Sequence, residues 1–304
     1  MSDSAASPIR RILVPLDQST EAEWVLPLAS ALASALGARL RVASVFLPVA
    51  LEIIAPSASA DVEAAMTELR QQLRDYLRDV GDRLATQCTS PVEDELIRGR
   101  SLRTTFGEAA AIAGALARSA QGRGVDLILM TTHGRGGASR VWLGSVADAL
   151  LRQTRVPLLL VRPSRDPGRG PFRRILVALD GSPRAEAVLP GALALAARPA
   201  GRVTLLRVVP PRAGLATSAA EDLDRIAAAL VDAGVAVTPR IVEDDHPAHA
   251  ILRTGEELDA DLLALATHGR GGVSRMVLGS VTDKVVRGTD RPVLVVRPEV
   301  ASSD

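Results

Sequence analysis

The chain is poor in several residue types that particular functions require. It has one cysteine, Cys88, in 304 residues, which excludes an internal disulfide and a zinc site built on cysteines. Its aromatic residues are three Phe, two Trp and one Tyr, too few to stack the bases of a single-stranded nucleic acid. The 36 Lys and Arg residues balance 35 Asp and Glu residues. This balance gives no indication of a basic surface for nucleic acid or for an anionic membrane.

The sequence also lacks long apolar runs. No stretch reaches the roughly 18 consecutive apolar residues of a membrane span, and the N-terminal MSDSAASPIRR does not have the pattern of a secretory signal. We therefore expect a cytoplasmic protein with neither a membrane nor a nucleic acid as partner.

What the sequence does contain is an internal repeat. Arg10–Asp17 reads RRILVPLD and Arg173–Asp180 reads RRILVALD. Thr132–Pro163 and Thr267–Pro298 align without gaps and are identical at most positions. The chain is therefore a tandem duplication, with expected domains at residues 1–163 and 172–304. Residues 164–171 carry the Pro and Gly of an exposed linker.

Within each half, short β-rich runs alternate with helical stretches, which predicts an α/β fold with a parallel, doubly wound sheet. The predicted helices of the first half are residues 20–36, 61–86, 103–121 and one that begins near Ser145. The predicted strands are residues 12–16, 40–47, 92–97, 125–131 and 157–161, then 175–179, 203–209, 235–242, 262–266 and 293–296.

A glycine-rich segment follows the fourth strand of each half, His133–Ser145 and His268–Ser280. Glycines let a backbone approach a ligand closely, and the unpaired amides at a helix N-terminus favour phosphate. Two arginines accompany the glycines in each copy, Arg135 and Arg140 or Arg270 and Arg275. The alternative is structural, because Ser145 and Ser280 each begin an S-x-x-D sequence typical of a helix cap.

Two common phosphate-binding loops are excluded by spacing. A P-loop needs a lysine before its Ser or Thr, and Gly144 and Gly279 stand there instead. The dinucleotide fingerprint G-x-G-x-x-G fails because Ser139 and Ser274 occupy its third glycine position.

The spacing instead resembles the signature of the universal stress protein family: G-x-x-G, nine residues, then G-S or G-T, with an aspartate after the first strand. The chain places nine residues between Gly134 and Gly144 and between Gly269 and Gly279, each followed by serine. The resemblance covers nearly the whole chain and implies two tandem Rossmann-like domains. Each would be an open five-stranded parallel sheet of order 3-2-1-4-5 that binds ATP, with Mg²⁺ as a further component.

The resemblance also implies site residues. Asp17 and Asp180 would hold the base or ribose, and Val45 and Val208 would pack on adenine. Ribose and phosphates would contact Gly134, Gly144, Ser145, Gly269, Gly279 and Ser280. The neighbouring residues assigned to the nucleotide site are Pro15, Leu16, Thr131, His133, Arg135, Val146, Ala178, Leu179, Ala266, His268, Arg270 and Val281.

The two halves differ at the first glycine of that signature. Thr131 stands there in the first half and the smaller Ala266 in the second, and Gly181 follows Asp180 where Gln18 follows Asp17. We expect the second half to bind nucleotide at least as well as the first.

Three functions remain open: a regulatory ATP-binding module, a slow ATPase, and a nucleotide-free dimerisation scaffold. The S-G-G-x-D-S loop of related ATP-consuming sheets is replaced by LDQSTEA and LDGSPRA, which argues against an efficient enzyme. His246 and His249 have metal-ligand spacing, but Pro247 indicates a helix start, and no metal site is predicted. The last strands, PLLLVRP and RPVLVVRP, are short apolar edges, which are an aggregation liability when unpaired. The resemblance implies that these edges pair with each other, so we expect the two halves to form a pseudo-dimer, with a further homodimer as an additional partner state.

Overall fold

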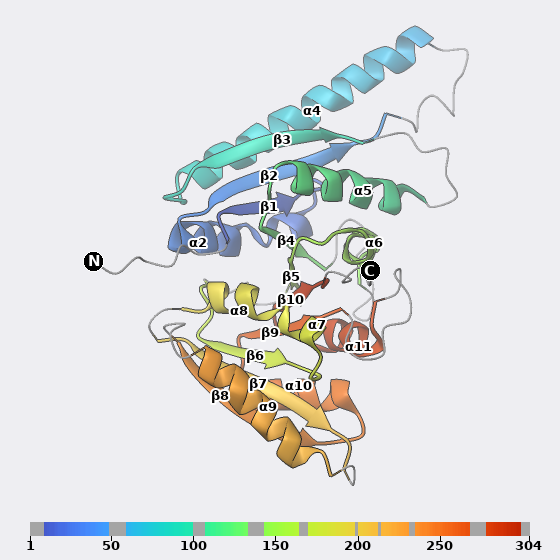
Figure 1. Ribbon diagram of the computed structural model, residues 1–304. Coiled ribbons are helices and arrows are strands. Elements are labelled where there is room, and N and C mark those ends of the chain that lie inside the picture. Colours follow the sequence, from blue (N-terminus) through green and yellow to red (C-terminus); the bar gives the residue numbers. More distant parts are fainter. Residues whose placement is uncertain are drawn as a thin grey trace.

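The computed structural model describes residues 9–48, 59–99, 107–132, 143–163, 170–197, 200–211, 214–230, 235–267 and 278–298. The predicted linker, at 164–171, lies mostly outside this range. In the part described, the chain forms one continuous ten-stranded sheet with helices on both faces (Figure 1).

The strand order is β3-β2-β1-β4-β5-β10-β9-β6-β7-β8, so each half has the order 3-2-1-4-5. The strands of the first half are β1 (Arg11–Pro15), β2 (Arg39–Phe46), β3 (Val92–Arg98), β4 (Leu127–Thr131) and β5 (Leu158–Val161). Those of the second half are β6 (Arg174–Ala178), β7 (Arg202–Val209), β8 (Ala236–Glu243), β9 (Leu262–Ala266) and β10 (Val293–Val296). The expected α/β fold and strand order are confirmed.

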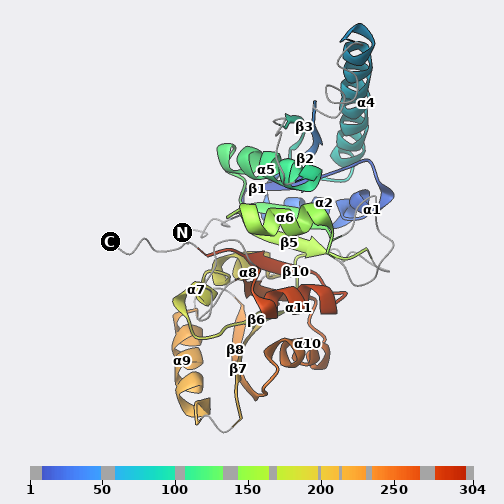
Figure 2. The same cartoon turned by 90° about the vertical axis from the view of Figure 1, so that its right-hand side faces the viewer.

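The two halves join along their last strands. β5 and β10 pair antiparallel, with Leu159 opposite Leu294, whereas the strand pairs within each half are parallel. Figure 2 shows the halves stacked on either side of this seam. The pairing confirms the expected pseudo-dimer, and it removes the two apolar edges that would otherwise be exposed.

The helices follow the strands as the α/β pattern requires. The first half has α1 (Thr20–Glu23), α2 (Leu26–Leu36), α4 (Ser59–Ala85), α5 (Gly107–Gly122) and α6 (Ser145–Gln153). The second half has α7 (Pro183–Glu186), α8 (Leu189–Leu195), α9 (Ala216–Ala229), α10 (Pro247–Glu257) and α11 (Ser280–Gly288). None of these helices combines the length and the apolar character needed to cross a membrane.

One predicted helix, residues 20–36, is wrong as a single element, because α1 ends at Glu23 and α2 starts at Leu26. Pro27 lies in the first turn of α2, where its missing N–H costs nothing, but inside a continuous helix its ring would clash with the carbonyl four residues earlier. The repeat has the same break, since α7 and α8 are separate and Pro190 opens α8.

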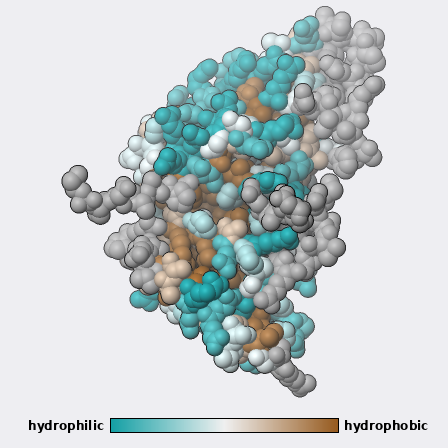
Figure 3. All heavy atoms as spheres, in the orientation of Figure 1, coloured by the Kyte–Doolittle hydropathy of each residue, from teal (hydrophilic) through white to brown (hydrophobic). Residues whose placement is uncertain are grey.

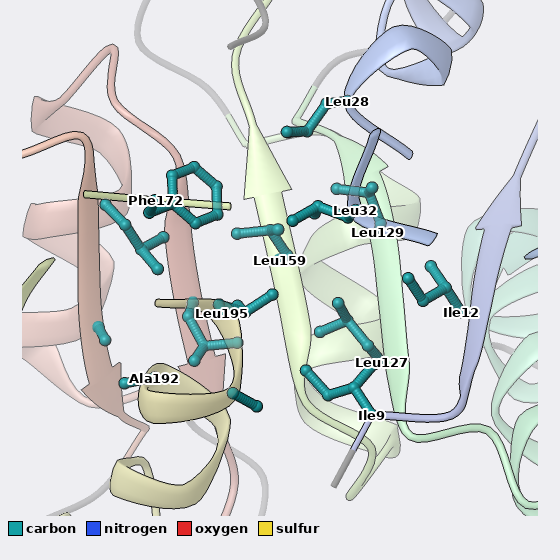
Figure 4. Packing of buried hydrophobic residues seen from close by; sticks show 14 of the residues in the cluster. Ile9, Ile12, Leu28, Leu32, Leu127, Leu129, Leu159, Phe172, Ala192 and Leu195 are labelled. Atoms are coloured by element: carbon teal, nitrogen blue, oxygen red, sulfur yellow. The ribbon is translucent and has the colours of Figure 1, made fainter. Parts of the chain in front are cut away.

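The core consists of two apolar layers, one on each face of the sheet, and both cross the seam. Figure 4 shows Leu159 of β5 between Leu32 and Leu129 of the first half and Phe172 and Leu195 of the second. On the surface, Figure 3 shows apolar side chains gathered at the level of the seam, with mainly hydrophilic surface above and below it. The halves therefore share one core across their junction.

Part of the difference in length between the halves lies in one helix. α4 has 27 residues and α9 has 14, and α4 extends beyond the strands that it covers (Figure 1). Both helices lie on the same face of the sheet, where each packs against its second and third strands.

Candidate functional site

The two aspartates that follow the first strand of each half begin the same local structure. The Asp17 carboxylate accepts hydrogen bonds from the Ser19 amide (3.1 Å) and hydroxyl (2.5 Å). Asp180 accepts the equivalent bonds from Ser182 at 3.0 and 2.7 Å. Ser19 and Ser182 in turn cap α1 and α7. One oxygen of each aspartate therefore holds the turn, so these residues have a structural role in addition to the predicted ligand role.

The residue after each aspartate has a left-handed backbone. Gln18 has φ 66° and Gly181 has φ 83°. A side chain is disfavoured in this region and glycine is not. The turn at Gln18 is thus strained, whereas the turn at Gly181 is relaxed.

The residues that cap α6 and α11 are not the serines that the sequence suggested. Gly144 and Gly279 are themselves the N-cap residues, and neither helix has a side-chain cap. The S-x-x-D interpretation as a capping box is therefore wrong. Ser145 and Ser280 are the first helical residues and are exposed, while Asp148 and Asp283 pair with arginines one turn later, Arg152 and Arg287.

The amides of these two glycines are already used within the protein. Gly144 N–H donates to the Thr132 carbonyl at 2.6 Å, and Gly279 N–H donates to the Thr267 carbonyl at 3.0 Å. A Cβ on Gly279 would come closer than 3.0 Å to that same Thr267 oxygen. The glycine is therefore required by its contact with Thr267, the residue after β9, and its amide hydrogen is already engaged there.

The first-turn amides after each glycine remain candidates for an anion. Amides at the first positions of an α-helix have no carbonyl one turn back to accept their hydrogen bonds. In α6 and α11 these positions are Ser145 and Val146, and Ser280 and Val281. Thr131, at the end of β4, is buried, and Ala266, at the end of β9, is partly buried.

Several predicted site residues fall outside the described residues. They are His133, Gly134, Arg135, His268, Gly269 and Arg270. Of the others, Leu16 and Leu179 are core residues at 4% exposure, and Pro15 and Ala178 close the strands before the aspartates.

A pocket of about 340 Å³ lies where β6 and β7 end and α9 begins. It brings together two residues of different strand ends: Asp180, which the family resemblance assigned to the base or ribose, and Val208, which it assigned to the adenine. Apolar atoms also come from Val209, Pro210, Leu215 and Ala219, and polar ones from Gly181, Arg207, Ser218 and Asp222. Its volume is at the lower end of those of small-molecule sites.

The sequence analysis missed two charged residues of this pocket, Arg207 and Asp222. The Arg207 side chain is 6% exposed and contacts the Asp222 carboxylate at 2.6 Å. Asp222 also pairs with Arg225 at 2.6 Å. Hydrogen bonds from Arg225 and Arg207 hold the pKa of the Asp222 carboxyl below its usual range. The sequence signal was an arginine inside an apolar strand, RVTLLRVV, where the other copy reads RLRVASVF.

The strand register identifies the matching residue of the first half. Pro15 lies beside Ala43, and Ala178 lies beside Leu206, so the next residues along β2 and β7, Ser44 and Arg207, correspond. Ser44 is buried and its hydroxyl donates to the Leu16 carbonyl at 2.8 Å. The buried cation of the second half is therefore replaced by a small, locally bonded hydroxyl.

The pocket-facing helices also correspond. An exposed leucine precedes the buried residues of each helix, Leu69 in α4 and Leu215 just before α9. The buried residues after this leucine follow at the same spacing in both helices. On this correspondence Leu73 takes the place of Ala219, and Tyr76 that of Asp222. Burial raises the pKa of Tyr76 above its usual range, with Glu23 and Asp17 adding to the shift.

A further large residue lies at this end of the first half. Phe46, the last residue of β2, packs under the guanidinium of Arg70 at 5.0 Å. Leu73, Tyr76 and Phe46 thus make the first half bulkier at three positions around this end of the sheet, whereas Ser44 is smaller than Arg207.

The remaining candidates of the sequence analysis are two histidines and the cysteine. His246 is the residue before α10, as Pro247 predicted, and His246 and His249 are both exposed. No cluster of three or more His, Cys, Asp or Glu side chains suitable for a metal occurs among the residues described. Cys88 is a buried core residue.

Comparison with known proteins gives a consistent result. The model of the "Universal stress protein family" matches residues 8–162 and again 171–297. A universal stress protein of Mycolicibacterium smegmatis is 29% identical over 301 residues, covering 94% of this chain and 97% of that protein. One from Mycobacterium tuberculosis is 30% identical over 188 residues, 57% of this chain and 62% of its own.

Among solved structures, a universal stress protein from Archaeoglobus fulgidus superposes with a TM-score of 0.70 at 22% identity, covering 95% of this chain and 96% of that one. This likeness concerns the fold. Because the family model matches both halves and together the matches span most of the sequence, the chain belongs to the universal stress protein family, with two such domains in tandem.

Proposed function

We propose that this chain is an ATP-binding regulatory module of the stress response, in which bound nucleotide sets the conformation or the choice of partner. Family membership supports the stress-response role. The observation that carries the nucleotide proposal is the pocket of about 340 Å³ lined by Asp180 and Val208. In parallel α/β sheets, ligands bind at the carboxyl ends of the strands, where this pocket lies.

The charges of the pocket favour the base end of the nucleotide. Its lining contains two carboxylates, Asp180 and Asp222, and one guanidinium, Arg207. A phosphate chain would be repelled by the carboxylates, whereas a base edge can donate to one of them. The phosphates would then lie toward the first turn of α11, where the helix dipole favours negative charge. Ser280 and Val281 belong to that turn.

Magnesium would enter this site with the phosphates. Mg²⁺ commonly keeps several waters and binds through one or two carboxylates together with substrate phosphates. The described residues provide no acidic cluster that would hold the ion by itself, which fits a metal that arrives with ATP.

Mass analysis of nucleotide released by denaturing freshly purified protein, followed by calorimetric titration with ATP and Mg²⁺, tests this function. The variant Ala219→Leu places in the pocket the larger residue found in the first half, and we expect it to weaken binding at least tenfold. Ala228→Leu, exposed and later in α9, is the matched control and should bind normally. If the wild-type chain bound no nucleotide, the scaffold interpretation, based on the β5–β10 seam, would replace the proposal.

Phosphate release distinguishes the regulatory module from a slow ATPase. We expect the wild-type chain to release phosphate from ATP no faster than Ala219→Leu, the variant with weakened binding. Release that clearly exceeds this background would assign hydrolysis to the second half.

A further inference from the structure

The ten-stranded sheet ends in two edge strands, β3 in the first half and β8 in the second. An edge strand presents unpaired amide and carbonyl groups, and proteins usually block or cover them. Successive residues of a strand turn these backbone groups to opposite sides. The hydrogen bonds to the inner neighbour therefore show which residues of each edge strand point outward.

The edge strand of the second half, β8, is blocked by a proline. The amide of Ala236, its first residue, donates to the Gly201 carbonyl, and the amide of Asp244, the residue after it, donates to the Val209 carbonyl. The even-numbered residues of β8 therefore point toward β7, and Pro239 is turned outward. Because proline has no N–H, the outer side of β8 lacks a donor near its middle.

The edge strand of the first half, β3, has no such block. On its inner side the Gly99 amide donates to the Phe46 carbonyl, and the Pro91 carbonyl accepts from the Leu40 amide. The odd-numbered residues therefore point toward β2. The even-numbered residues, none of which is proline, direct their amide and carbonyl groups outward: Val92, Asp94, Leu96 and Arg98. Within the described ranges, β3 pairs with β2 alone.

The side chains of the outward-pointing residues lie on the face of the sheet that α4 covers. Leu96 is partly buried and packs against the apolar layer on that face. Asp94 and Arg98 are exposed on either side of it, and neither forms an ion pair with any residue that the structure describes. Glu93 and Glu95, on the opposite face, are neutralised by arginines of their own half.

We propose that β3 is a dimerisation edge, which pairs antiparallel with β3 of a second copy of this chain about a two-fold axis. The chain already joins its own halves in this way, because β5 and β10 pair antiparallel with Leu159 opposite Leu294. A homodimer of this kind continues the sheet across the axis and leaves β8, the blocked strand, at both outer edges. The proposal does not depend on nucleotide binding.

Charge selects one register of this pairing. A two-fold axis at Asp94 or at Glu95 would place that carboxylate directly opposite its own copy, which is destabilising. An axis at Leu96 places the two Leu96 side chains opposite each other, and Asp94 of each copy opposite Arg98 of the other. The outward-pointing part of β3 is therefore complementary to itself, which favours a second copy over an unrelated strand.

The helices leave room for this pairing. Figure 1 shows α4 running along β3, and α4 packs on both β2 and β3. Across the axis the two α4 helices therefore lie about two strand spacings apart, or roughly 10 Å. That is a normal distance between the axes of packed helices.

Exchanging the charges of Asp94 and Arg98 tests the proposal. Sedimentation equilibrium of the full chain at micromolar concentrations should give twice the 31.9 kDa of one chain. Asp94→Arg and Arg98→Asp each place like charges opposite one another at two positions of the dimer. Each variant should raise the dimer dissociation constant about 10- to 100-fold. The double variant Asp94→Arg/Arg98→Asp restores opposite charges and should dimerise like wild type.

Two further variants separate this edge from the rest of the surface. Glu243→Arg is the matched control, because Glu243 is exposed at the end of the other edge strand, β8. Its dissociation constant should stay within about twofold of wild type. Leu96→Pro copies the block at Pro239, since it removes an outward amide and leaves the hydrogen bonds to β2 in place. It should give a monomer with the circular dichroism spectrum of wild type.

The outcomes are distinct. A wild-type chain that stays monomeric would overturn the proposal and leave the edge to a strand of another protein. Slow hydrogen exchange of the Leu96 amide in such a monomer would mean that another part of the same chain covers the edge. A dimer that both single variants leave intact, or that the double variant does not restore, would also overturn it, because the contact would then lie elsewhere.

Discussion

A methyl group added at Gly279 gives the sharpest test of how the candidate site is built. The Gly279 amide donates to the Thr267 carbonyl at 3.0 Å, and a Cβ would come closer than 3.0 Å to the same oxygen. That oxygen is backbone, so no side-chain rotation can relieve the contact. Gly279→Ala must therefore push the start of α11 away from the end of β9.

The expected cost follows from two terms. Overpacking by one methyl costs about 1–3 kcal/mol when the backbone has to shift. Lengthening or losing the amide hydrogen bond adds about 0.5–1.5 kcal/mol. Together they predict a loss of roughly 2–4 kcal/mol in the free energy of unfolding, a large part of the ~5–15 kcal/mol of a typical domain.

Urea unfolding followed by circular dichroism measures this loss, and Gly81→Ala is the matched control. Gly81 lies inside α4, and a Cβ there would meet nothing within 4 Å. The control should raise the unfolding free energy by about 0.5–1 kcal/mol, because alanine is the better helix former. One methyl group should thus have opposite effects at the two sites.

A Gly279→Ala protein as stable as wild type, within about 0.5 kcal/mol, would refute the reasoning. In that case the glycine would not be held by contact with its own strand. Its presence would then have to be explained by a ligand.

Three further predictions concern residues around the two sites. Gln18→Gly should stabilise the chain by ~0.5–1 kcal/mol and Gly181→Gln should destabilise it by a similar amount, because both positions have a left-handed backbone that favours glycine. Thermal unfolding measures both changes, and effects of the same sign would contradict this reasoning. Asp222→Asn should lower the unfolding free energy at neutral pH. Since the pKa of Asp222 is lowered in the fold, its stabilising contribution is present above the ordinary value of about 3.9 and is lost as the pH falls through the lower value. The difference from wild type in urea titrations should therefore shrink below about pH 4, and a constant difference would point to packing instead. Ser280→Ala should change the free energy of unfolding by less than about 0.5 kcal/mol, because Ser280 is exposed and is not the N-cap. The same variant should weaken ATP binding in calorimetry. A loss of about 1 kcal/mol in the free energy of unfolding would show that the Ser280 hydroxyl caps the helix.

The sequence by itself determined the duplication, the α/β class and most strand positions. These follow from local information: repeated segments such as RRILVPLD and RRILVALD, and apolar runs of strand length separated by helical stretches. The sequence also shows that an apolar edge such as PLLLV has to be covered, but the expectation that the two last strands cover each other came from the family resemblance. Pro27 carried the signal for the break between α1 and α2, a local steric effect that was readable from the sequence.

Only the tertiary structure decided how the candidate site is built. The bond of the Gly279 amide to Thr267 requires a close approach between a strand end and a helix start, and the spacing alone fits a phosphate contact equally well. Arg207 and Asp222 lie on different elements, and whether they meet depends on how α9 packs on β7. The same packing gives the second half a pocket beside Ala219, where the first half has the bulkier Leu73. Local residue patterns set the elements, but the distances between side chains on different elements depend on packing, and those distances decide what each half can bind.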